Sequence, residues 1–194
     1  MKTIYLFRHS KPVKQGQFSN SDIPLSAEGK EKILNLATEM QLGCNLKIYT
    51  SPYRRAFETA ELIACNPMCD DRLIERGIGE RDTFTKEIWQ GQYVDATLRN
   101  IGGESFSEVR ARVSSVICEI LCDMHDDESV IVVSHAAAIC AYLQQFCEII
   151  VTDADSKQRQ IKFHDRVLME GAIQSPSCFK LDFEQELIGV TYYE

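Results

Sequence analysis

Ile4-Tyr5-Leu6-Phe7-Arg8-His9 joins an apolar run to a basic pair near the start of the chain. The run is typical of a buried parallel strand whose carboxyl end opens onto Arg8 and His9. Ligands of open α/β sheets bind at this end of the strands. A guanidinium beside an imidazole suits phosphate, because the cation holds the oxygens while a ring nitrogen attacks phosphorus or moves a proton. By itself the pair is weak support, since such dipeptides are common.

Strands and helices are expected to alternate beyond this run. Residues 47–50 and 129–134 are short apolar runs and are expected to be strands of the same sheet. Ser26 is expected to cap a helix that ends near Met40. The core-facing residues of that helix would be Ile33, Leu34, Ala37 and Met40.

Two other helices carry start signals. Ser51 is expected to cap a helix that has Pro52 at its first position. Ser105 and Glu108 form a capping box before a long apolar stripe. The alternation predicts an α/β fold, a three-layer α/β/α sandwich with a mostly parallel sheet.

The last part of the chain differs from this pattern. Residues 179–183 alternate between apolar and charged, and 187–193 follow as a hairpin partner, so the sheet is expected to have an antiparallel edge. One domain is expected to span residues 1–194, with a helical cap inserted at about 81–101. Residues 149–176 show no strong periodicity and receive no assignment.

Composition excludes several classes of protein. The net charge of -8 argues against general binding to nucleic acid, which needs a basic face. No apolar run approaches the ~18 residues of a membrane span, and the first residues are interpreted as a strand and not as a secretory signal, so a cytoplasmic protein is expected. The eight cysteines are interpreted as reduced thiols. Cys118 and Cys122 are interpreted as small hydrophobic residues of a helix and not as zinc ligands.

Residues 51–60 begin at a strand end and open a helix with Arg54 and Arg55 in its first turn. Free N–H groups and the helix dipole favour an anion there, and cations are unfavourable unless an anion is expected. His135 follows the strand at 129–134 in a comparable position. Surface arginines in a solvated turn, and a hydrogen-bonded histidine at a strand boundary, are the alternatives to an anion site.

Further segments follow Arg8-His9 in a fixed order. They are 22–29; Ser51-Pro52 with Arg55-Ala56 and Thr59-Ala60; 73–76 with Gly79-Glu80; 102–105; and Ser134-His135. The ordered set resembles the histidine phosphatase superfamily, whose fold is phosphoglycerate mutase-like, over nearly the whole chain. The length resembles the phosphatase branch more than the mutases, which are usually longer.

The resemblance implies a role for each motif residue. His9 would be the nucleophile that forms a phosphohistidine, and Arg8 and Arg55 would neutralise the phosphoryl group and disfavour the imidazolium form of His9. His135 would donate to a phosphoryl oxygen. Glu75 would protonate the leaving alkoxide and later take a proton from water. The resemblance implies no metal and no other cofactor, since the arginines neutralise the phosphate.

The identity of the acid is the least certain of these assignments. The neighbouring carboxylates that could replace Glu75 are Glu80, Asp82 and Glu104. One branch of the family has its acid directly after the second histidine, and Ala136 occupies that position here, which favours Glu75. Gln15 lies near the position of a phosphate-binding asparagine in the family and is a further candidate ligand.

Three departures from the family pattern affect the functional interpretation. Ser10 and Ala136-Ala137 stand where the family usually has glycine, and larger residues there could narrow the pocket. The leading hypothesis is a metal-independent phosphomonoesterase that acts on a small phosphate ester. The alternatives are a phosphoglycerate mutase-like phosphotransferase, a catalytically weak phospho-ligand-binding protein and a phosphatase of protein phosphohistidine. The pattern indicates neither a particular ester nor an oligomeric state.

Overall fold

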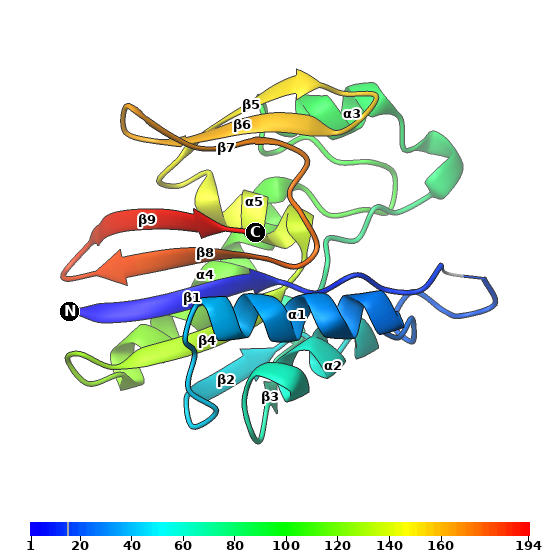
Figure 1. Ribbon diagram of the computed structural model, residues 1–194. Coiled ribbons are helices and arrows are strands. Elements are labelled where there is room, and N and C mark those ends of the chain that lie inside the picture. The colour runs from blue at the N-terminus through cyan, green and yellow to red at the C-terminus, as the bar shows by residue number, and fades with distance from the viewer. Residues whose placement is uncertain (15) are drawn as a thin grey trace.

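The computed structural model describes residues 1–14 and 16–194. In this part of the chain the main sheet has six strands in the order β3-β2-β4-β1-β8-β9 (Figure 1). The strands are β1 (Lys2–Arg8), β2 (Lys47–Thr50), β3 (Met68–Cys69), β4 (Ser129–Ser134), β8 (Ser177–Phe183) and β9 (Leu187–Tyr193). β1, β2, β3 and β4 pair in parallel, whereas β8 is antiparallel to β1 and β9 is antiparallel to β8. The prediction of a mostly parallel sheet with an antiparallel edge is confirmed.

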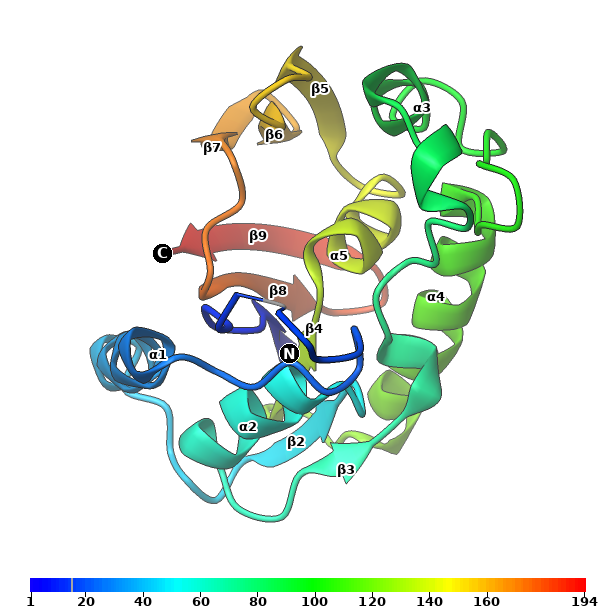
Figure 2. The ribbon, with the colours of Figure 1, turned by 90° about the vertical axis from the view of Figure 1, so that its right-hand side faces the viewer.

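Helices cover both faces of this sheet (Figure 2). Ile4 and Leu6 of β1 pack in one core with the helices α4 (Phe106–Asp123) and α5 (Ala136–Leu143). Phe7 points to the other face, where the core contains residues of α1 (Ala27–Glu39) and α2 (Arg54–Ile63). Successive residues of a strand alternate between the two faces, and both faces of β1 are buried, as its continuous apolar run predicts. The three-layer sandwich is confirmed.

Hydrogen bonds at the helix starts agree with two of the three predicted caps. Ser26 Oγ accepts from Gly29 N at 3.0 Å, and Ser105 and Glu108 form the reciprocal capping box of α4. The prediction for Ser51 is wrong, because α2 begins at Arg54 and its N-cap, Tyr53, makes no side-chain cap bond. The Ser51 hydroxyl instead accepts from Tyr53 N at 3.2 Å and contacts a histidine described below.

One predicted core residue, Leu34, lies on the solvent side of its helix. In α1 the buried aliphatic residues are Ile33 and Leu36, whereas Leu34 is 47% exposed, because a spacing of three residues returns to the same face and a spacing of one does not. Cys118 and Cys122 of α4 are free and exposed. No described helix combines the length and the apolar character needed to cross a bilayer.

A second, smaller sheet lies apart from the main one (Figure 1). It is antiparallel, in the order β5-β6-β7, and occupies the region for which the sequence made no assignment. Its strands are β5 (Glu148–Asp153), β6 (Gln158–Phe163) and β7 (Arg166–Gly171). Near it lies α3 (Lys86–Gly91), and the Lys86 amine binds the Asp155 carboxylate at 2.9 Å. The short 3-10 helices η1 (Asp71–Leu73) and η2 (Arg81–Thr83) complete the described elements.

Truncation of a central core residue should destabilise the fold strongly. Leu6 is fully buried in β1, so Leu6→Ala is expected to lower the free energy of unfolding by about 2–5 kcal/mol, through lost burial and a residual cavity. Leu34→Ala makes the same chemical change at the exposed position of α1 and should change stability by less than about 0.5 kcal/mol. Urea unfolding measures both values, and equal losses would contradict the assignment of the core.

Candidate active site

Parallel pairing brings polar residues to one edge of the main sheet. Arg8 is in register with Ser134, and His9 N donates to Ser134 O at 3.0 Å. Ser51 N donates to Val133 O at 3.0 Å. The residues after β1, β2 and β4 therefore meet beyond the carboxyl ends of the strands, which is where ligands of open α/β sheets bind.

The His9 imidazole is 6% exposed and has both nitrogens in hydrogen bonds. Nδ1 lies 2.8 Å from Ser10 O, and Nε2 accepts from Arg55 Nε at 3.1 Å. A carbonyl oxygen only accepts, so we assign the ring proton to Nδ1 and the lone pair to Nε2. The nitrogen that could attack phosphorus is therefore the one that faces Arg55.

Arg55, at the start of α2, contacts both histidines. Besides Nε, its Nη2 donates to His135 Nδ1 at 3.2 Å, and its Nη1 donates to Asn20 O at 2.5 Å. The guanidinium also lies over the Tyr53 ring, 5.0 Å from the ring centroid. No described carboxylate lies within 4.0 Å of its nitrogens, so its charge is available for an anion.

His135 is fully buried at the N-cap of α5. Because its Nδ1 accepts from Arg55, its proton is assigned to Nε2, which donates to Ser51 Oγ at 2.9 Å. The His9 and His135 ring centroids are 5.0 Å apart, with an interplanar angle of 62°. Both imidazoles and one guanidinium thus form a single hydrogen-bonded cluster.

Burial and nearby cations keep both imidazoles neutral. The pKa of His9 lies well below its ordinary value, first because of burial and then because of the charges of Arg8 and Arg55. The pKa of His135 is also well below its ordinary value, through burial, then His9 and Arg55. A neutral His9 ring keeps the lone pair of Nε2, as a nucleophile requires.

Arg8 ends β1 and connects this cluster to an adjacent cavity. Its Nη1 donates to Ile173 O, and its Nε is buried without a described partner. Burial lowers the pKa of Arg8, and the Glu75 carboxylate opposes that shift. Both side chains line the cavity.

Glu75 lies at the N-terminus of α5. Its carboxylate accepts from Ala138 N at 3.2 Å, Ala137 N at 3.5 Å and Arg76 N at 2.9 Å. The amides of Ala137 and Ala138 lie in the first turn of α5 and would lack partners within the helix, and the carboxylate also complements the positive end of the helix dipole. The fold therefore holds Glu75 beside the residue that follows His135.

The three alternative carboxylates lie elsewhere. Glu104 binds Arg112 Nε at 2.8 Å and accepts from Gly77 N at 2.7 Å, so it holds together the loops after Glu75. Glu80 and Asp82 are exposed. Among the described residues, Glu75 is the carboxylate that lines the cavity.

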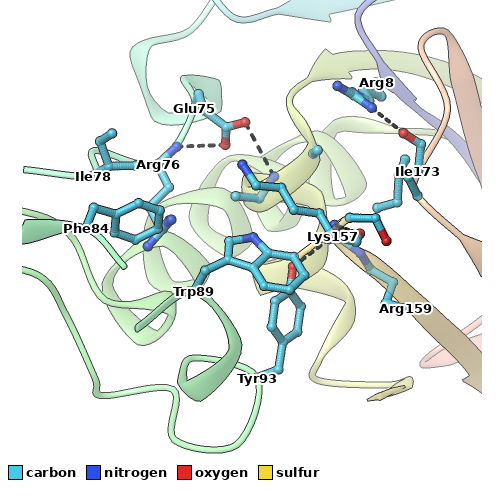
Figure 3. Close-up of a pocket in the computed structure, with 14 residues that line it drawn as sticks. Arg8, Glu75, Arg76, Ile78, Phe84, Trp89, Tyr93, Lys157, Arg159 and Ile173 are labelled. Carbon is cyan, nitrogen blue, oxygen red and sulfur yellow. Dashed lines mark hydrogen bonds between the residues drawn. The ribbon is translucent and has the colours of Figure 1, made fainter. Parts of the chain in front are cut away.

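The cavity has a volume of about 460 Å³, which is within the range of small-molecule sites (Figure 3). One wall consists of Phe84, Trp89 and Tyr93, from the segment between η2 and α4. The β5–β6 turn and the start of β6 provide another wall, with Lys157 and Arg159. Neither imidazole ring nor Arg55 belongs to the described lining, and Arg55 Nε donates to His9 Nε2.

Comparison with known proteins identifies the family to which the chain belongs. A sequence model described as the histidine phosphatase superfamily (branch 1) matches residues 4–160. The chain belongs to this superfamily. The Escherichia coli protein named "Probable phosphoglycerate mutase GpmB" is 32% identical over 159 residues, which cover 72% of this chain and 72% of that protein. The protein is therefore an enzyme of the histidine phosphatase type.

Solved structures share the fold of this histidine phosphatase. The mycobacterial glucosyl-3-phosphoglycerate phosphatase superposes with a TM-score of 0.71 at 20% identity, covering 99% of this chain and 96% of that chain. YhfR of Bacillus stearothermophilus gives a TM-score of 0.68 at 24% identity, covering 97% and 95%. Both likenesses extend beyond residue 160 and include the antiparallel edge.

The sequence departures have specific positions in this histidine phosphatase. Ser10 is fully buried, and its hydroxyl donates to Gly29 O at 2.6 Å, so it ties the loop after β1 to α1. Ala136 and Ala137 do line the cavity. Gln15 lies outside the described residues.

Two residues near the site have contacts that the sequence did not predict. Ser51 was expected to cap a helix and to belong to the motif that contains Arg55, whereas its hydroxyl accepts from His135 Nε2. Arg159 belongs to a segment that received no assignment, yet Arg159, Ile161 and Phe163 are buried at every second position of β6. In the sequence only Ile161 and Phe163 show this alternation as apolar residues, and Arg159 occupies the preceding inward position.

The buried histidines predict how stability depends on pH. In the unfolded chain each ring binds a proton as the pH falls through about 6.5, whereas both folded rings stay neutral well below that pH. The unfolded state then binds more protons, so the free energy of unfolding should fall as the pH is lowered from about 6.5. His9→Asn should make this fall shallower by up to about 1.4 kcal/mol per pH unit. Urea unfolding at several pH values measures the slope, and an unchanged slope would contradict a neutral His9.

Proposed function

We propose that the protein is a metal-independent phosphomonoesterase that hydrolyses a small phosphate ester through a phosphohistidine on His9. The proposal is carried by the hydrogen bonds of His9, which keep its proton on Nδ1 and turn the lone pair of Nε2 toward Arg55. A dianionic phosphoryl group would replace this bond, with its oxygens held by Arg8 and Arg55. The arginines would thereby supply the charge that a metal ion supplies in other phosphatases.

In the first step, His9 Nε2 attacks phosphorus, the N–P bond forms and the ester P–O bond breaks. Phosphoryl transfer depends on alignment and on stabilisation of charge, which two guanidinium groups and His135 Nε2–H would provide. His135 would exchange its bond to Ser51 Oγ for a bond to a phosphoryl oxygen. Glu75, in its protonated form, would give its proton to the leaving alkoxide.

In the second step, water attacks the phosphohistidine. The ionised Glu75 takes a proton from this water, a new O–P bond forms and the N–P bond breaks. Inorganic phosphate leaves, and His9 and Glu75 return to their initial protonation states. Glu75 is favoured for both transfers because it shares the cavity with Arg8, whereas Glu80 and Asp82 are exposed and Glu104 is paired with Arg112.

The surrounding elements restrict the substrate. We take residues 1–194 as one domain in which the segment 81–101 acts as a cap, since Phe84, Trp89 and Tyr93 form one wall of the cavity. A small metabolite fits such a covered site better than a folded phosphoprotein or a nucleic acid, and cytoplasmic metabolites are the expected source. A mutase-like transfer remains the second candidate, because the relative from Escherichia coli is named a phosphoglycerate mutase.

Replacement of the nucleophile should abolish turnover. His9→Ala is expected to lower kcat/KM for an aryl phosphate by at least about a thousand-fold, because no phosphoenzyme can form. Released phosphate is measured for wild type and variant with a chelator present, and acid-labile phosphoenzyme is trapped from wild type. Isomerisation of phosphoglycerate without phosphate release would support the mutase instead. Phosphate binding without turnover by the wild type would favour the binding protein.

The acid can be identified from the leaving group. Glu75→Gln should lower kcat/KM for alkyl phosphates by about 10²-fold or more, because an alkoxide needs a proton. The loss should be much smaller for an aryl phosphate, whose phenolate leaves without one. Glu80→Gln removes a nearby exposed carboxylate and should keep wild-type rates on both substrates. Equal losses on the two substrates for Glu75→Gln would contradict the role of a general acid.

A further inference from the structure

The cavity beside the phosphoryl site contains more positive charge than a phosphate monoester needs. Its lining includes Arg8, Arg76, Lys157 and Arg159, and Glu75 is the described carboxylate among them (Figure 3). This concentration of cations occurs in a chain with a net charge of -8. After Arg8 and Glu75 are assigned to the phosphoryl site, three cations remain.

Arg159 is the most informative of these cations. It is 5% exposed, and no described carboxylate lies within 4.0 Å of it. Its Nη1 donates to Tyr93 Oη at 2.5 Å and to Cys140 Sγ at 3.2 Å, its Nη2 donates to Lys157 O at 2.9 Å, and its Nε is buried without a described partner. Burial of a guanidinium without a counter-ion is costly, unless a bound anion compensates it.

Neutral groups hold this guanidinium in place. It lies 5.1 Å from the Trp89 ring centroid and 5.4 Å from that of Tyr93, so two rings of the cap segment contact it. Burial raises the pKa of Tyr93 well above its ordinary value, so the phenol is neutral and does not compensate the charge. The guanidinium is therefore preorganised and its charge is not balanced.

Lys157 adds a second cation on the same wall. It lies in the turn before β6, and Figure 3 shows its side chain between Glu75 and Trp89. Among the described residues, no carboxylate forms an ion pair with its amine, and Lys157 lines the same cavity as Arg8 and Arg159. Arg76 lies on the opposite wall, where it contacts the Phe84 ring at 4.9 Å and donates to Gln92 Oε1.

We propose that Arg159 and Lys157 form a subsite for a second anionic group, so that the substrate is a phosphate ester that also carries a carboxylate or a second phosphate. This inference rests on the proposed function, because it places the reacting phosphoryl group at Arg8 and Arg55. The planar, forked guanidinium of Arg159 suits either a carboxylate or a phosphate. Trp89 supplies an apolar surface for the carbon skeleton between the reacting phosphate and the second anionic group.

Matched ligands test the subsite. Glycerol 1-phosphate and 3-phosphoglycerate differ by a carboxylate, and fructose 6-phosphate and fructose 1,6-bisphosphate differ by a phosphate. For at least one pair, kcat/KM of the wild type should be about ten-fold or more higher for the member with the second anion. Calorimetry on His9→Ala gives the ratio of Kd values for the same pairs without turnover. The pair that shows the ten-fold difference identifies the second anionic group as a carboxylate or a phosphate.

Two lysine variants separate the subsite from the general charge of the protein. Lys157→Gln should reduce the preference for the ligand with the second anion, measured as the ratio of kcat/KM values within a pair, by about five-fold. Lys162→Gln removes the same charge from the same small sheet, at a residue that pairs with Glu148 at 3.7 Å, and should keep the wild-type preference. Arg159→Gln should reduce it further. Since Arg159 is buried, the melting temperature of the Arg159→Gln variant is measured first. If this variant does not fold, the variant of the exposed Lys157 provides the test.

The outcomes distinguish this inference from the proposed reaction. If the phosphate esters are hydrolysed and both pairs show less than about a two-fold preference for the member with the second anion, the subsite is overturned and the phosphatase stands. A ten-fold preference in binding without hydrolysis would support the subsite and overturn the phosphatase. Equal preferences in Lys157→Gln and Lys162→Gln would overturn the assignment to Lys157 and Arg159.

Discussion

The contact of Arg55 with the two imidazoles organises the site. One guanidinium donates to His9 Nε2 at 3.1 Å and to His135 Nδ1 at 3.2 Å. This arrangement requires the ends of β1 and β4 and the start of α2 to lie together, which the parallel order of the central strands provides. It also fixes the tautomers of both rings, because a guanidinium can only donate. The lone pair of His9 therefore points to the place where a phosphoryl group would meet its cations.

Uncompensated buried charge is the energetic cost of this arrangement. Arg55 and Arg159 are each 5% exposed and contact neutral groups, and burial lowers the pKa of Arg55. The surrounding fold sustains them through its apolar core and through polar contacts, such as those of the Glu75 carboxylate at the start of α5 and the pairing of Glu104 with Arg112. Because the chain as a whole is acidic, the cavity is a local basic region.

Two elements cover the cavity, and the sequence predicted only one of them. The segment at 81–101 is rich in aromatic residues, and this composition led to the expectation of a cap. The small sheet β5-β6-β7 went unassigned because its strands are short and two of them present few buried residues. Arg159 at an inward position also interrupts the apolar alternation of β6 that would mark a strand. A polar residue at a core position breaks the pattern on which strand prediction depends, and such positions are often functional.

Local periodicity and ordered motifs were sufficient to predict the alternation of strands and helices, the sandwich and the antiparallel edge, and they indicated the motif residues Arg8, His9, Arg55 and His135. The tertiary structure alone decided the start of α2 at Arg54, the contact of Ser51 with His135, and the exposure of Leu34, because they depend on neighbours distant in the chain. It also decided that Lys157 and Arg159 share a cavity with Arg8. Residues about 150 positions apart meet there because the segment between β7 and β8 contacts Arg8 and β8 pairs with β1, and no local pattern records that proximity.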